Sequence, residues 1–189
     1  MSNDEDDRNK FDDPAKRAEL VQTLGRLRHG QLVPVEVPGA LLDFGKAKLV
    51  EARPDVEALL TDADPAIRAT ALQVLTLDFA RADDLRANTR IARQFLLEDP
   101  DPEARAKGAS AFGWLLRNSQ DRDALTLLAS VVRNEQEVRE VREAAYLALL
   151  SITRFNPRQH LKFVSYGLDL HRDVDWALVD SFLSGPRAE

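Results

Sequence analysis

The chain has 189 residues, no cysteine and a formal net charge of −6. The length suits one domain, and 44% apolar residues suffice for a continuous core. The missing cysteines exclude disulfides, a cysteine nucleophile and thiolate zinc sites. No apolar run approaches the roughly 18 residues of a membrane span, and the acidic balance differs from the basic footprint of a nucleic-acid-binding protein.

An acidic segment, MSNDEDDRNKFDD, opens the chain. Its six acids and two bases contribute −4 of the net charge of −6. We expect residues 1–12 to form a disordered acidic tail, because a charge run of this kind is usually solvated. The segment has no apolar core and is the reverse of a signal peptide, so we expect a cytoplasmic location.

A first helix is predicted over about 14–29. Asp13 precedes a proline there, and an aspartate caps free backbone N–H groups while proline suits the first helical position. Gly30 ends this helix. The two prolines within 31–38 disfavour a helix, so we expect an extended linker over these residues. It either lies over the core or acts as a binding loop.

A short helix is expected over 39–53, where Pro54 breaks it. On this interpretation residues 13–53 comprise capping helices and the extended linker, and residues 54–185 form a repeat array. The later helices are predicted, in chain order, over about 65–80, 84–98, 102–117, 121–133, 137–154, 157–168 and 174–184.

One sequence unit recurs at a period of 37 residues, which is typical of a solenoid or repeat array. Its arginine is the clearest marker and occurs as Arg68, Arg105 and Arg142, whereas the fourth copy has Val179 in this place. An acid lies six residues before the first two arginines, and an Asp-Pro pair predicts a helix start between them. Each helix then carries one apolar stripe, which only a stacked neighbour can bury.

Two details of the stripe predict local packing. The middle position holds a small residue in each copy (Ala71, Gly108 and Ala145), which suggests close approach by a neighbouring helix. In the first copy Asp78 stands where an apolar residue is due. Its buried face therefore either ends a turn early or shifts in phase to Phe79.

The pattern resembles the HEAT repeat, and within that superfamily the HEAT-like repeats of the phycobilin lyases and of many bacterial proteins. The resemblance covers about residues 55–184 and weakens in the fourth copy. It implies an all-α fold, a short right-handed α-solenoid of stacked antiparallel helix pairs. It also implies a hydrogen-bonded ladder between neighbouring repeats, whose members would be Asp62, Asp99, Arg68, Arg105 and Arg142.

The second helix of each pair would line the concave side of such a solenoid. The positions that face away from the core form the predicted partner-binding set: Gln73, Leu77, Lys107, Ser110, Trp114, Arg117, Leu147, Ser151 and Arg154. Trp and Arg are enriched in interface hot spots, so Trp114 is the leading contact residue. The alternative is that Trp114 packs against the neighbouring repeat.

Catalytic equipment is not visible in the sequence. The chain lacks GxSxG, P-loop, GxGxxG and HExxH motifs. His171 lies near Asp169, Asp173 and Asp175, a set that could bind a divalent metal. Asp173 and Asp175 are in phase with the repeat acids, however, so we expect helix capping and no metal. His29 and His160 have no carboxylate or nucleophile nearby in sequence. We therefore expect no enzyme activity and no cofactor.

The leading hypothesis is a non-catalytic module that binds another protein, as a scaffold, adaptor or inhibitor. The first alternative is a nucleic-acid-binding protein similar to HEAT-like DNA glycosylases, with a basic channel made by Arg81, Arg86, Arg90, Arg93, Lys107, Arg117 and Arg154. The second is a tetrapyrrole lyase or chaperone, by resemblance to the phycobilin lyases.

Overall fold

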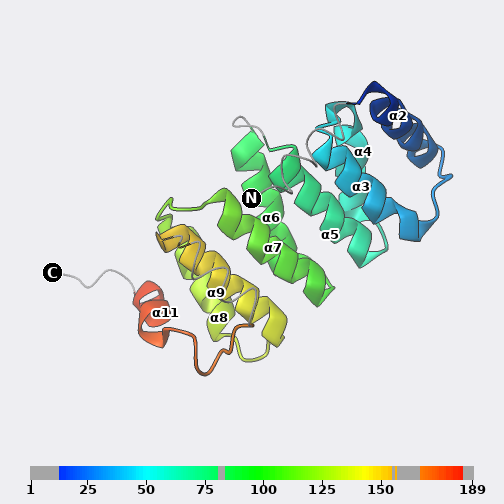
Figure 1. Ribbon diagram of the computed structural model, residues 1–189. Coiled ribbons are helices and arrows are strands. Elements are labelled where there is room, and N and C mark those ends of the chain that lie inside the picture. Colours follow the sequence, from blue (N-terminus) through cyan, green and yellow to red (C-terminus); the bar gives the residue numbers. More distant parts are fainter. Residues whose placement is uncertain (1–12, 81–83, 155, 157–166, 185–189) are drawn as a thin grey trace. The chain divides into compact units, whose positions relative to one another are not determined.

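The computed structural model describes residues 13–80, 84–154, 156 and 167–184 (Figure 1). Helices are the only regular elements in these ranges, which confirms the expected all-α class. Within the same ranges no helix combines the length and apolarity that crossing a membrane requires. Two compact units divide the chain between Leu85 and Arg86, and each is described by itself.

The described part of unit 1 consists of four α-helices and several single turns of helix, and most of them pack against α3. Its α-helices are α2 (Pro14–Arg28), α3 (Val37–Lys46), α4 (Arg53–Ala58) and α5 (Pro65–Gln73). Between and after them lie the 3₁₀ turns η1 (Pro34–Glu36), η2 (Val50–Ala52) and η3 (Leu59–Thr61), and the π-helical turn η4 (Val74–Asp78). Helix α3 contacts α2 and α5 and contributes the fully buried Leu41 and Phe44. The core of this unit therefore lies along α3.

The prolines of unit 1 begin helices and do not interrupt them. Pro34 starts η1, Pro38 is the second residue of α3 and Pro54 the second residue of α4. The expected extended linker over 31–38 is therefore wrong, and so is the expected break at Pro54. A proline lacks only its own N–H, and the first-turn N–H groups of a helix have no partner within the helix in any case.

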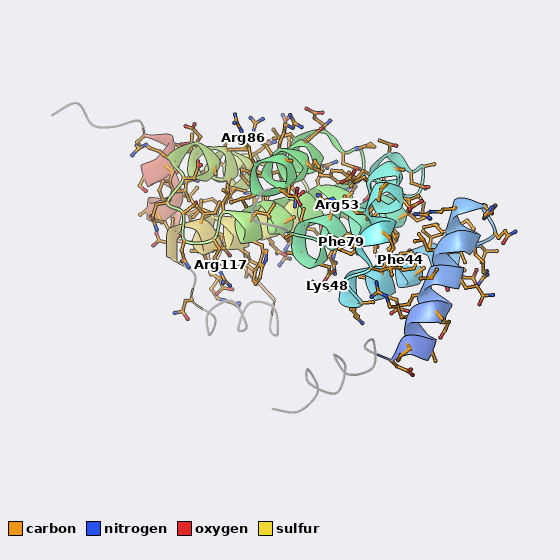
Figure 2. All side chains as sticks on the ribbon, turned by 90° about the horizontal axis from the view of Figure 1, so that it is seen from above. Phe44, Lys48, Arg53, Phe79, Arg86 and Arg117 are labelled. Atoms are coloured by element: carbon orange, nitrogen blue, oxygen red, sulfur yellow. The ribbon has the colours of Figure 1, made fainter. Side chains whose placement is uncertain are left out.

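The π-helical turn η4 resolves the phase question in the first copy of the repeat. One extra residue in this turn leaves Asp78 half-buried at the edge of the core and brings Phe79 onto the buried face, with 4% of the Phe79 surface exposed. The apolar stripe thus shifts in phase and does not end early. Figure 2 labels Phe79 within unit 1. An uninterrupted α-helix would have put a carboxylate into the core, which is costly without a paired charge.

Unit 2 contains α6 (Leu85–Glu98), α7 (Pro102–Leu115), α8 (Arg122–Arg133), α9 (Arg139–Arg154) and α11 (Trp176–Leu183). Helix α9 contacts both α7 and α8, and α11 contacts α8. Figure 1 shows α7 and α9 side by side, with α6 and α8 in a layer behind them. Three residues join α6 to α7, so these two helices form an antiparallel pair. The helix predicted over 157–168 lies almost wholly outside the described residues.

The glycines of α7 allow its neighbours to approach closely. A Cβ atom on Gly108 would lie 2.5 Å from the backbone nitrogen of Leu96 in α6. A Cβ atom on Gly113 would lie 2.5 Å from the Cα atom of Ala148 in α9. The close approach predicted at Gly108 is therefore confirmed, and Gly113 serves the same purpose toward α9.

Aspartate caps begin the helices as the sequence predicts. Asp13, Asp64 and Asp101 accept hydrogen bonds from the first-turn N–H groups of α2, α5 and α7. Asp121 and Asp175 do the same for α8 and α11. These bonds satisfy donors that the helices leave free, so the N-terminus of each of these helices is set locally.

The expected arginine ladder uses backbone carbonyls as well as carboxylates. Arg68 donates to the carbonyl of Asp62 (2.8 Å), and Arg105 donates to the carbonyl of Asp99 (2.9 Å). The carboxylates of Asp62 and Asp99 each accept the N–H two residues further on. The six-residue spacing thus links each arginine to the main chain of its own turn. Arg142 similarly donates to the carbonyl of Val132, ten residues earlier (2.9 Å).

One link between successive copies is formed by Arg105 and Glu137. Two guanidinium nitrogens of Arg105 donate to the two carboxylate oxygens of Glu137, at 3.1 and 2.8 Å. The loop before α9 presents Glu137 to Arg105, 32 positions away in the sequence. Burial raises the pKa of the Glu137 carboxyl. The Arg105 hydrogen bond, the Val138 N–H and the Arg105 charge together outweigh burial, so the pKa lies below its ordinary value.

Candidate interaction face on α7

A polar and aromatic stripe runs along the exposed side of α7. Lys107, Ser110 and Trp114 follow one another at spacings of three and four residues, and Arg117 continues the stripe just after the helix ends. All four are exposed, because the opposite side of α7 carries the buried Ala104, Ala111 and Phe112. The stripe therefore faces solvent along its whole length. We call these four residues the α7 stripe.

Trp114 is the largest exposed side chain of the stripe, with 50% of its surface accessible. The guanidinium of Arg117 stacks over its ring, 4.6 Å from the ring centroid. A cation over an indole face is attracted by the ring quadrupole and orders both side chains. Trp114 is thus half-exposed and half-covered, between the two alternatives that the sequence left open.

The turn after α7 is anchored to the last turn of α9. The backbone N–H of Asn118 donates to the carbonyl of Ser151 (2.9 Å), and that of Gln120 donates to the carbonyl of Ile152 (3.2 Å). Both carbonyls belong to the end of α9, where a helix leaves its acceptors free. Asn118 and Gln120 adopt positive φ angles of 60° and 58°. This anchoring holds the Arg117 end of the stripe in place.

The predicted members on α9 contribute less than expected. Leu147 is half-buried, and Ser151 is buried with its hydroxyl donating to the carbonyl of Leu147 (2.9 Å). The side chain of Ser151 is therefore turned away from a partner. The side chain of Arg154 lies outside the part of the chain that the structure describes.

Gln73 and Leu77 belong to unit 1 and are described with it. Gln73 is half-buried in α5, and Leu77 is 41% exposed on η4. The structure thus brings together the α7 members of the predicted set within unit 2.

The arginines of the predicted nucleic-acid channel do not share one face. Figure 2 shows Arg86 and Arg117 on opposite sides of unit 2. Arg90 and Arg93 follow Arg86 on α6, in the layer away from α7 and α9, while Lys107 belongs to the α7 stripe. A single basic channel through unit 2 is therefore not formed by these residues. Arg81 lies outside the described residues.

A metal-binding cluster is not assembled in the described parts of the chain. No group of three or more His, Cys, Asp or Glu side chains there could hold a metal ion. Asp169 accepts the backbone N–H of His171, and Asp175 caps α11, so these acids have structural partners. The Nδ1 atom of His29 lies 2.7 Å from the carbonyl of Gly25. His160 lies outside the described residues.

Comparisons with protein-family models, with curated proteins and with solved structures found no match to this chain.

Proposed function

We propose that the chain is a non-catalytic interaction module, a short HEAT-like right-handed α-solenoid that binds another protein through the α7 stripe. The observation that carries the proposal is the half-exposed Trp114 with Arg117 stacked on its ring. Exposed tryptophan is uncommon on surfaces without a partner, and Trp and Arg are the residue types that dominate interface energetics.

The surroundings of Trp114 favour binding over catalysis. The stripe rests on a helix packed closely against α6 and α9 through Gly108 and Gly113. A rigid support lowers the entropy that is lost when a contact surface is ordered on binding. The stripe itself offers an aromatic surface, two cations and a hydroxyl, which are groups that recognise a partner and lack a nucleophile–base pair.

The α-solenoid part of the proposal is supported by the antiparallel α6–α7 pair, by the contact of α7 with α9 and by the Arg105–Glu137 link between successive copies. A helix pair with one apolar face needs a stacked neighbour, and an array of such pairs presents an extended surface. The split arginines of unit 2 count against the nucleic-acid alternative.

The test is affinity capture from a cell lysate with the native protein and with Trp114→Ala, followed by a binding titration with the purified partner. We expect the titration to show an affinity loss of about 30-fold or more, as for an interface hot spot. Leu97→Ala is the matched control, since Leu97 is 42% exposed on α6, in the other layer of unit 2. It should bind as the native protein does.

The opposing outcomes are distinct. A protein retained equally by native and Trp114→Ala chains would refute the α7 stripe as the binding surface. Retention of nucleic acid, released by moderate salt, would refute the protein-binding function, because a steep salt dependence is the mark of phosphate contacts.

A further inference from the structure

Helix α6 carries three arginines in one line on its exposed side. Arg86, Arg90 and Arg93 are spaced by four and three residues, which places them on one face of the helix. All three are exposed. With a rise of 1.5 Å per residue the line is about 10 Å long. We call these residues the α6 arginine line.

The three arginines are unusual in lacking partners. Among the described arginines, the side chains of Arg86, Arg90, Arg93 and Arg122 make no hydrogen bond, ion pair or ring contact. Most other described arginines pair with an acid: Arg17, Arg26, Arg28, Arg53, Arg105, Arg133, Arg139 and Arg172. In a chain with more acids than bases, three unpaired arginines on one helix face are left available for an external anion.

The three positive charges of the α6 arginine line do not stabilise helix α6. Arg86 lies in the first turn of α6, where the helix dipole makes positive charge unfavourable. The only acid within α6 is Glu98, at its last position, and it accepts a hydrogen bond from Gln94. Interaction with a carboxylate-rich partner would offset both the repulsion within the line and its unfavourable place in the dipole.

The chain itself contains a segment of the complementary chemistry. Asp4, Glu5, Asp6 and Asp7 are four consecutive acids, and extended they span about 10 Å at 3.3 Å per residue. The length therefore matches the α6 arginine line. Each guanidinium can hold a carboxylate through two parallel hydrogen bonds.

We propose that the α6 arginine line binds the acidic segment Asp4–Asp7 of a second copy of this chain, so that the protein associates with itself head to tail. The line lies on the opposite side of unit 2 from the α7 stripe, so self-association leaves the stripe free. A nucleic acid is the less suitable occupant. Three cations neutralise few phosphates, Arg117 lies on the other side of unit 2, and the chain's net charge of −6 opposes a polyanion.

The test uses two full-length, charge-reversed variants in sedimentation velocity at low ionic strength. One is Arg86→Glu/Arg90→Glu/Arg93→Glu, and the other is Asp4→Lys/Glu5→Lys/Asp6→Lys/Asp7→Lys. We expect the native protein to gain mass with concentration and each variant alone to stay monomeric. An equimolar mixture should associate again, because the intact line can bind the intact acidic segment and the reversed line and the reversed segment are also complementary to each other. Neutralising the line with glutamine should weaken native self-association about tenfold or more.

Controls separate a specific contact from general charge attraction. Arg122→Glu changes an equally unpaired arginine on α8 and should leave self-association unchanged, as should Trp114→Ala, which tests the α7 stripe independently. Far-UV circular dichroism checks that the variants fold. A native protein that is monomeric at every concentration, or a mixture that forms no complex, overturns the proposal. Salt-sensitive retention of a mixed-sequence DNA oligonucleotide by the arginine line of a monomeric protein would overturn it in favour of nucleic acid.

Discussion

Replacing Gly108 by alanine tests the closest approach between α6 and α7. The new Cβ atom would lie 2.5 Å from the nitrogen of Leu96, 2.9 Å from the Cβ of Phe95 and 3.0 Å from the carbonyl oxygen of Ala92. Two of these are backbone atoms, so relief requires α6 to move. Overpacking of this kind costs about 1–3 kcal/mol, while alanine gains about 1 kcal/mol over glycine in helix propensity. Because two of the three contacts are with backbone atoms, the overpacking cost should lie in the upper part of its range. We therefore expect the free energy of unfolding to fall by about 1–2 kcal/mol.

The assay is urea and thermal unfolding followed by far-UV circular dichroism. A loss of that size lowers the Tm by roughly 2–8 °C for a chain of this length. Gly25→Ala is the control, because Gly25 lies inside α2 with nothing within 4 Å of its added Cβ. That change should raise the free energy of unfolding by about 0.5–1 kcal/mol. If Gly108→Ala is as stable as the native protein or more stable, the close packing of α6 on α7 is refuted.

Three further substitutions test the π-helical turn and the charged groups. Phe79→Ala should lower the free energy of unfolding by about 3–5 kcal/mol because it leaves a core cavity, whereas Leu77→Ala, two residues away and exposed, should change it by less than about 0.5 kcal/mol; equal effects in urea unfolding would contradict the phase shift. The carboxylate of Glu137 has a lowered pKa, so its contribution to stability is present above the ordinary value of 4.5 and is lost as the pH falls through the folded-state pKa. The stability gap between native protein and Glu137→Gln, measured by urea midpoints at neutral and acid pH, should therefore narrow on acidification, and a constant gap would count against the Arg105 pair. Burial raises the pKa of Asp78, outweighing its neighbouring lysines, so its ionised form opposes folding above the ordinary value of 3.8. Asp78→Asn should thus be neutral or stabilising near pH 7, and a clear loss in thermal unfolding would show that the charge is needed.

Helix starts could be predicted from sequence because they depend on neighbouring residues. Asp64 and Asp101 cap α5 and α7 through N–H groups two or three residues away, so the side chain and its target are fixed by local geometry. The small residue Gly108 could be recognised for a similar reason, since its place in the apolar stripe shows which side must meet a neighbour.

Prolines were harder to interpret from sequence. A proline both disfavours a helix before it and suits the first turn of a helix after it. Pro38 and Pro54 take the second role, and the choice depends on the burial of Val37 and Val56 in the core of unit 1. That burial is a tertiary effect, which no pattern around the prolines displays.

The candidate site was predictable in part. The helical period placed Lys107, Ser110 and Trp114 on one side of α7, as observed. The period could not show that Ser151 is buried, because its burial depends on the path of the turn after α7, which donates to the carbonyl at that position. The lack of partners for the α6 arginine line likewise becomes visible only in the folded structure, because it depends on the positions of all the acidic side chains in the described chain.

The sequence by itself determined the all-α class and the capped helix starts, because both follow from contacts between residues close in the chain. Only the tertiary structure decided which carboxylate meets Arg105, which residue of η4 enters the core and which cations share a face. Glu137 reaches Arg105 across 32 positions, and Phe79 replaces Asp78 inside because a core excludes an unpaired charge. These outcomes depend on differences in free energy between alternative packed arrangements of the helices, so residues close in the sequence do not determine them.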